Sequence, residues 1–115
     1  MSVKSAVTVK ENYMFRRIYH KGRSVVTPFF VVYCLRSKTG QSRLGVTVST
    51  KLGHAVVRNR ARRLLRELYR LSRPDMLPGY DVILVARSRC AAGDFARMLQ
   101  LYRDALDKLG LLKKA

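Results

Sequence analysis

The chain has no tryptophan, only two cysteines and only seven acidic residues among its 115 amino acids. Cys34 and Cys90 lack a CxxC partner, so we expect buried free thiols in a reducing compartment rather than a disulfide or a metal site. The longest apolar run, Phe29–Leu35, is far shorter than a membrane span, and residues 1–15 contain no apolar segment of the signal-peptide type. These absences favour a cytoplasmic protein.

Patterns that carry chemistry are also missing. His20 and His54 stand outside any HxxxH motif, and the seven carboxylates form no DxD or ExxE pair that could hold two metal ions. The chain contains neither a phosphate-binding GxxxxGK[ST] loop nor a glycine-rich dinucleotide loop. We therefore expect no catalytic side chain, no metal site and no cofactor bound by the protein itself.

Basic residues dominate what remains. The chain has 24 Lys and Arg residues and a formal net charge of +17. Hydrophobic residues make up 48% of it, enough for a folded core, and we expect one domain over residues 1–115. Such a charge surplus favours a polyanionic partner, either nucleic acid or an anionic membrane. The membrane is the weaker alternative, because the arginine-rich segment has no Trp or Phe to insert into lipid.

That segment is 51–73, which has eight Lys or Arg residues and one acidic residue, Glu67. Its apolar residues recur at helical spacing and predict one buried stripe. The stripe consists of Val57, Ala61, Leu64, Leu68 and Leu71, with Leu65 beside them. Its arginines recur every four residues and predict a cationic row beside the stripe. The row consists of Arg58, Arg62, Arg66 and Arg70, with Arg63 added to it.

Two interpretations of this cationic row are open. A solvated helix face is the common one, but such faces usually interleave acidic residues that neutralise the repulsion between like charges. A surface that meets phosphates is favoured here, because the guanidinium group binds phosphate through two hydrogen bonds and stacks on bases. Asn59, a mediocre helix former between two arginines, is either a local cap or a specific contact, and we favour the contact.

The remaining pattern predicts short elements around one sheet. Residues 1–9 are expected to be a loosely ordered N-terminus, and residues 111–115 a basic tail. The expected strands are 24–26, 29–35, 43–49 and 80–86, and the expected helices are 12–21, the arginine-rich segment, and one from Asp94 to Gly110. The order α-β-β-β-α-β-α indicates an α+β fold, a two-layer α/β sandwich with a four-stranded sheet. General rules predict a right-handed β-α-β crossover if its strands are parallel.

Aromatic residues accompany the first helix and strand. Phe15 and Tyr19 share one face of the helix, and basic residues surround them. The strand over 29–35 is apolar on both faces, so both must be covered by helices or by a ligand. From composition alone, core packing is the favoured role for these rings.

The arginine-rich segment resembles the "RNR" signature of the bacterial ribonuclease P protein subunit. The order K-x-G-x-A-V-x-R-N-x-x-[KR]-R-x-x-R-E holds without a gap from Lys51 to Glu67. The similarity continues outside the signature and covers about residues 8–110. His54, where the family often has a small polar residue, and Ala61-Arg62, where Ile-Lys is common, depart from the pattern without removing a cation.

This resemblance implies a function. Ribonuclease P removes the 5′ leader from precursor tRNA, and its RNA subunit performs the hydrolysis with Mg²⁺. The protein subunit binds that RNA and the leader, and we expect no membrane and no obligate protein partner. The positions that correspond to the RNA-binding face are Lys51, Arg58, Asn59, Arg60, Arg62, Arg63, Arg66 and Arg70. The positions that correspond to the leader-binding cleft are Phe15, Arg16, Tyr19, Val31 and Tyr33.

The resemblance also revises two expectations. It implies a ribosomal-protein-like fold with a left-handed β-α-β crossover, which we adopt over the general rule. It turns the aromatic residues from core into stacking surfaces for single-stranded RNA. A structural ribosomal protein or RNA chaperone is the alternative, and it would bury Phe15, Tyr19 and Tyr33. A protein-only nuclease is disfavoured by the scattered carboxylates.

Overall fold

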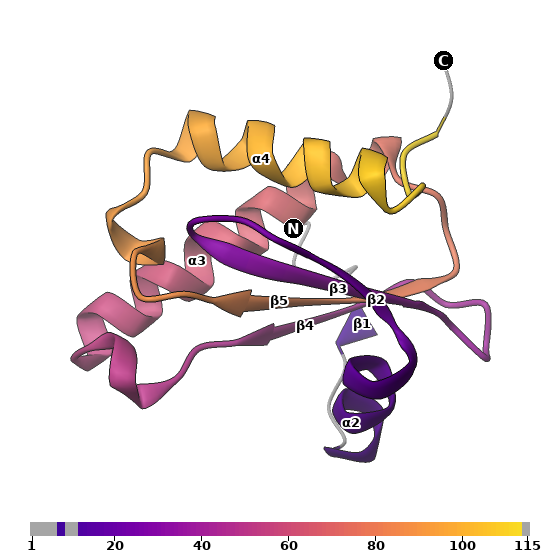
Figure 1. Cartoon of the computed structure of the whole chain (residues 1–115), viewed down its shortest axis with the longest axis horizontal. Helices are drawn as coiled ribbons and strands as arrows, with labels where there is room; N and C mark the ends of the chain where they lie inside the picture. Colours follow the sequence, from indigo (N-terminus) through magenta and orange to yellow (C-terminus); the bar gives the residue numbers. More distant parts are fainter. Residues whose placement is uncertain (1–6, 9–11, 114–115) are drawn as a thin grey trace.

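A mixed β-sheet with strand order β1-β4-β5-β3-β2 forms the middle of the molecule (Figure 1). The computed structural model describes residues 7–8 and 12–113. The strands are β1 (Val7–Thr8), β2 (Arg23–Val26), β3 (Phe30–Arg36), β4 (Arg43–Thr47) and β5 (Tyr80–Ala86). The helices are α2 (Asn12–Lys21), α3 (Ala55–Ser72) and α4 (Phe95–Lys108), with short 3₁₀ turns η1 (Thr50–Leu52), η2 (Arg73–Asp75) and η3 (Cys90–Ala92). The predicted α+β class is confirmed, and the predicted element order holds from α2 to α4.

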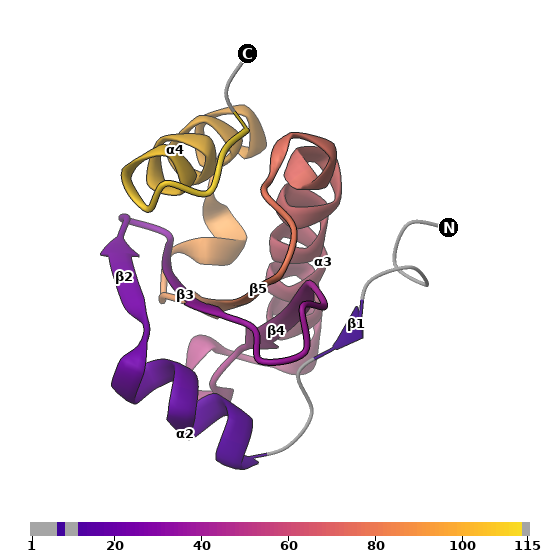
Figure 2. The same cartoon turned by 90° about the vertical axis from the view of Figure 1, so that its right-hand side faces the viewer.

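The helices cover the two faces of the sheet unequally. Helices α3 and α4 lie together on one face, and α2 crosses beneath the other (Figures 1 and 2). Strands β4 and β5 are parallel neighbours joined through α3, and β5 is antiparallel to β3. Because β5 enters between β4 and β3 while α3 stays on the face shared with α4, the crossover is left-handed (Figures 1 and 2). The right-handed β-α-β crossover predicted from general rules is therefore wrong, and the left-handed crossover implied by the family resemblance is confirmed.

Both ends of the chain contribute more to the fold than we expected. Val7 and Thr8 pair in parallel with Arg43 and Leu44, which adds a short fifth strand to the four predicted. Within the N-terminus that was expected to be loosely ordered, these two residues thus pair with hydrogen-bonding groups at the outer edge of β4. The rest of the range 1–9 lies outside the described residues.

Residues 111–113, the described part of the expected basic tail over 111–115, are likewise tied to the fold. Leu111 is buried, and its carbonyl oxygen accepts a hydrogen bond from the Leu77 backbone N–H at 2.7 Å. The Lys113 N–H donates to the Asp75 carbonyl oxygen at 2.7 Å. The segment is held because the end of α4 returns to the η2 turn, where these backbone groups find partners.

The main core lies between the sheet and the pair α3 and α4. Its largest fully buried members include Phe30, Val32, Leu65, Leu68, Val82, Leu84, Met98, Tyr102 and Leu106. The stripe predicted for α3 is rotated by about one position. Tyr69 and Ser72 are buried, whereas Leu71 is 41% exposed. The buried face passes through Leu65 rather than Leu64, because α3 must contact the sheet as well as α4.

A buried ion pair links β4 to β5 on the face that α2 covers. Arg43 and Asp81 are direct neighbours across the two strands. The Arg43 guanidinium donates from Nε and Nη2 to the two Asp81 carboxylate oxygens, each at 2.7 Å. This contact with Asp81 raises the pKa of Arg43. Met14 of α2 lies above the pair, with its Sδ atom 3.5 Å from Nη1. The ion pair thus fixes the register between β4 and β5 and also provides a contact for α2.

We predict that Asp81→Ala lowers the free energy of unfolding by about 3–5 kcal/mol, because Arg43 would keep a buried charge without its partner. Urea denaturation followed by circular dichroism measures this loss. The control is Asp75→Ala, which removes the exposed partner of Arg103 and should cost no more than about 1 kcal/mol. Equal losses in the two variants would contradict a special role for the buried pair.

Candidate nucleic-acid interface

Helix α2 leaves one row of the sheet uncovered. Strand pairing places Val26 opposite Val31, Val31 opposite Val85, and Val85 opposite Thr47. Because side chains alternate along a strand, all four lie on the α2 face, across β2, β3, β5 and β4. Val26 is 63% exposed and the other three are half-buried. With neighbouring strands ~4.8 Å apart, the row extends over ~14 Å.

An aromatic cluster stands beside this row. The ring centroids of Tyr19 and Tyr33 are 4.8 Å apart in an edge-to-face arrangement, and those of Phe15 and Tyr19 are 6.2 Å apart. The Tyr19 hydroxyl lies 3.3 Å from Thr47 Oγ1, which joins α2 to the end of β4. Tyr19 is 38% exposed, and Phe15 and Tyr33 are half-buried.

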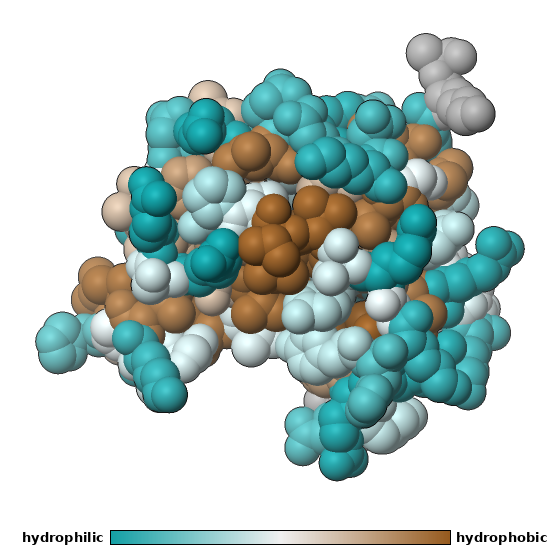
Figure 3. All heavy atoms as spheres, viewed as in Figure 1, coloured by the Kyte–Doolittle hydropathy of each residue, from teal (hydrophilic) through white to brown (hydrophobic). Residues whose placement is uncertain are grey.

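The row and the cluster form one recess, which we call the α2 cleft. Its floor is Val26, Val31, Val85 and Thr47, and its wall is Phe15, Tyr19 and Tyr33. In the space-filling view the lower outline of the molecule is indented between α2 and the segment that leads into α3 (Figure 3). Arg16 is exposed on α2, three residues before Tyr19 and therefore on the same side of the helix. The five residues assigned to a cleft from the sequence thus lie together.

Three floor residues were not predicted: Val26, Thr47 and Val85. Each is an ordinary β-strand residue in the sequence, and only the register across four strands brings them beside Val31. The one available signal was their alternation with buried neighbours, which places each on a face without saying that α2 would leave it open.

The arginines of the predicted row lie along one continuous helix, but they differ in exposure. At about 100° per residue, Asn59, Arg63, Arg66 and Arg70 fall on the outward arc of the helix, and all four are exposed. Arg58 and Arg62 lie on the arc of the helix that also carries the buried Tyr69, one or more turns before it, and both are half-buried. Arg60 is exposed on the opposite side, toward α4, and Lys51 is exposed in η1 before the helix. The cationic surface therefore wraps around most of α3.

Local contacts hold several of these side chains. Arg62 Nη1 donates to the Asn59 amide oxygen at 3.0 Å, so Asn59 orients an arginine within the surface. Arg70 donates from Nε to Glu67 Oε1 at 2.7 Å and makes a second contact through Nη2. The Arg70 contact lowers the pKa of Glu67, and the Glu67 contact raises the pKa of Arg70. The single acidic residue of the segment is thus matched by one arginine, and the excess positive charge stays on the others.

The cysteines are free and buried. Burial raises the pKa of the Cys34 thiol, and it raises the pKa of Cys90 to about 11, so both are protonated at neutral pH. Among residues 7–8 and 12–113, no three His, Cys, Asp or Glu side chains are grouped closely enough to hold a metal ion. No helix in this described part is long and apolar enough to cross a membrane.

Comparison with known proteins connects these surfaces to one family. A family model described as "Ribonuclease P" matches residues 3–110. The chain belongs to the ribonuclease P protein family. A ribonuclease P protein component of Natranaerobius thermophilus is 42% identical over 108 residues, with 94% of each chain covered. The component of Alkaliphilus oremlandii is 34% identical over 113 residues, with 98% of this chain and 99% of that one covered.

Solved ribonuclease P proteins share the fold. The Staphylococcus aureus protein superposes with a TM-score of 0.81 at 34% identity, covering 95% of this chain and 100% of that one. The Thermotoga maritima protein gives a TM-score of 0.74 at 25% identity, covering 93% and 98%. The resemblance drawn from the RNR signature is confirmed. Membership in the ribonuclease P protein family implies a role in a ribonuclease holoenzyme and in tRNA 5′ processing.

Proposed function

We propose that this chain is the protein subunit of ribonuclease P and that it binds two RNA molecules through two different surfaces. The cationic surface of α3 binds the catalytic RNA subunit, and the α2 cleft holds the 5′ leader of precursor tRNA. Together they assist the endonucleolytic removal of the leader, which leaves the mature 5′ end. The observation that carries this proposal is the exposure of an aromatic cleft next to a helix rich in unneutralised arginine.

The charge of α3 supports the first contact. Each phosphate that an arginine neutralises releases a counterion, so affinity rises with the number of such contacts and falls with salt. Arg63 and Arg66 are exposed, and neither forms an ion pair among the described residues. They can therefore meet phosphates without first breaking an internal salt bridge, which would offset part of the gain.

The shape of the α2 cleft supports the second contact. A single strand lying along the row from Val26 to Thr47 would pass the exposed face of Tyr19, with its bases against apolar side chains. Every base has a face that can stack on an aromatic ring, so this mode holds RNA with little sequence preference. Arg16 on the same side of α2 can meet the leader backbone. The end of the row at Thr47 leads through η1 into α3, so the two RNA contacts adjoin.

The chemistry is assigned to the RNA subunit with its Mg²⁺, and this chain contributes binding and orientation. We propose that the protein binds no cofactor itself, needs no obligate protein partner, does not bind membranes and acts in the cytoplasm. A structural ribosomal protein or RNA chaperone is the alternative, and the exposure of Tyr19 beside an uncovered apolar row favours the leader-binding role over it.

Reconstitution tests the proposal. The purified chain is mixed with a bacterial ribonuclease P RNA and a precursor tRNA at low magnesium, where the RNA alone is slow. We expect faster cleavage at the mature 5′ end. Tight RNA binding without stimulation, by a correctly folded chain, would favour the structural RNA-binding alternative.

We predict that the double variant Arg62→Ala with Arg66→Ala weakens binding to the catalytic RNA. The slope of log affinity against log salt should fall by up to about one for each phosphate that the variant no longer neutralises. Filter binding at several salt concentrations measures both quantities. The control, Arg97→Ala with Lys108→Ala, removes the same charge from exposed positions on α4 and should leave the slope nearly unchanged. The same slope change in both variants would mean that only net charge matters.

A separate variant addresses the cleft. Tyr33→Ala should reduce the preference for precursor over mature tRNA by about 1–3 kcal/mol, because a stacking ring is removed. Binding of the holoenzyme to both tRNAs gives the preference. Tyr33→Phe keeps the ring and should retain the preference for precursor tRNA. Tyr13 is 63% exposed on the outer side of α2, and Tyr13→Ala should have no effect on that preference. If the variant binds precursor and mature tRNA more weakly by the same factor, Tyr33 does not contact the leader.

A further inference from the structure

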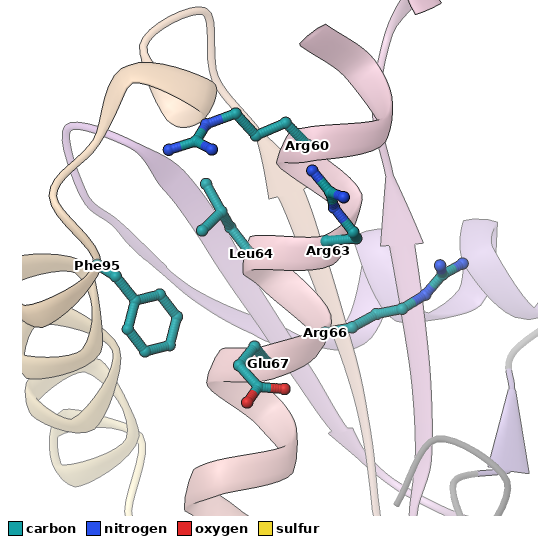
Figure 4. A pocket seen from close by; sticks show the side chains of 6 residues that line it. All are labelled: Arg60, Arg63, Leu64, Arg66, Glu67 and Phe95. Atoms are coloured by element: carbon teal, nitrogen blue, oxygen red, sulfur yellow. The ribbon is translucent and has the colours of Figure 1, made fainter. Parts of the chain in front are cut away.

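A second recess lies on the opposite face of the sheet, between α3 and the start of α4. It is open to solvent and has a volume of about 600 Å³, which is within the range of small-molecule sites. Its lining residues are Arg60, Arg63, Leu64, Arg66, Glu67 and Phe95. We call it the α3–α4 pocket (Figure 4). The α2 cleft and this pocket share no residue.

Phe95 forms one wall, and its backbone is firmly placed. It is the first residue of α4, directly after Asp94, whose side chain accepts a hydrogen bond from the Arg97 N–H at 3.1 Å. Gly93, which precedes Asp94, is buried. A Cβ at this position would lie 2.5 Å from Met98 Sδ, so the turn packs closely on the core. The half-buried Phe95 ring points across the gap toward α3, where Leu64 lies (Figure 4). A flat apolar surface is thus presented inside the pocket.

Arginines occupy the opposite wall and rim. Arg60 Nε donates to the Ala91 carbonyl oxygen of η3 at 2.8 Å, which fixes the direction of its side chain. Its two Nη groups have no acceptor among the described residues, and the same holds for the whole Arg63 guanidinium. Glu67, the acidic residue of the pocket, is held by Arg70. The pocket therefore keeps an excess of positive charge above an apolar floor.

We propose that the α3–α4 pocket binds one unpaired nucleotide of the catalytic RNA subunit. The base lies against Phe95 and Leu64, and Arg60 and Arg63 contact its phosphate groups. This inference rests on the proposed function, because it names a nucleotide of the same RNA that α3 binds. An aromatic ring beside arginines is the surface that recognises an unstacked base in single-stranded RNA. The positive charge of the pocket would attract RNA and an acidic peptide alike. The shape of the pocket favours RNA, since a planar base matches the Phe95 ring and an acidic side chain does not.

The absence of tryptophan from the chain provides a direct probe. Phe95→Trp would introduce one fluorophore into the pocket, and we expect its emission to fall when the catalytic RNA is added, because the base stacks on the indole. Tyr80→Trp is the matched control. Tyr80 is a half-buried aromatic residue at the start of β5 and is not among the residues that line the pocket. Its emission should change little.

Affinity gives the second measurement. Phe95→Leu keeps an apolar side chain but removes the ring, and we expect binding to the catalytic RNA to weaken about 5- to 150-fold, which is ~1–3 kcal/mol. Phe95→Tyr keeps the ring and should bind like the unmodified chain. Arg60→Gln and Arg63→Gln should each reduce the salt slope by about one. Circular dichroism and thermal unfolding establish that the variants are folded.

The outcomes separate this inference from the proposed function. If the unmodified chain stimulates cleavage but Phe95→Leu binds the RNA normally and the Phe95→Trp emission is unchanged, the pocket is not a nucleotide site and the subunit assignment stands. If the unmodified chain neither binds nor stimulates the RNA, the proposed function itself is wrong. Quenching by an acidic peptide such as polyglutamate, but not by the RNA, would assign the pocket to a protein partner and overturn the inference.

Discussion

The pairing of β5 between β3 and β4 is the constraint on which the rest of the structure depends. Its backbone is hydrogen-bonded on both sides, antiparallel to β3 and parallel to β4. Once β5 occupies this place, α3 must carry the chain from β4 across one face of the sheet, and α4 must return along the same face. The same pairing aligns Val31, Val85 and Thr47 on the other face. Both candidate RNA surfaces therefore derive from the position of one central strand.

Local signals predicted the elements well. The strand over 80–86 was predicted with its observed bounds, because a run that is apolar except for Asp81 lies between the turn residues Pro78-Gly79 and the charged Arg87. The last helix was predicted to begin at Asp94, and Asp94 does cap α4, because its side chain accepts a hydrogen bond from the Arg97 N–H. The strand predicted from Phe29 begins one residue later, since the Thr27 hydroxyl accepts hydrogen bonds from the Phe29 and Phe30 N–H groups and extends the turn.

Features that depend on distant parts of the chain were harder to predict. The rotation of α3 that buries Tyr69 and exposes Leu71 is set by simultaneous contact with α4 and the sheet, which periodicity alone does not resolve. The left-handed crossover came from the family resemblance and contradicts the general rule. Likewise the α3–α4 pocket joins Phe95 to Leu64 across 31 positions of the sequence, and no local pattern indicates that these two side chains meet.

The contact between Tyr19 and Thr47 has a consequence for the proposed binding of RNA in the α2 cleft. It ties the helix that walls the α2 cleft to the strand that floors it, and the edge-to-face contact of Tyr19 with Tyr33 adds a second tie. A receptor whose walls are already held apart loses little conformational entropy when its ligand arrives. Under the proposed function, most of the ordering on binding then falls on the flexible single strand, so a leader that is already extended should gain more affinity than one that must first unfold a hairpin.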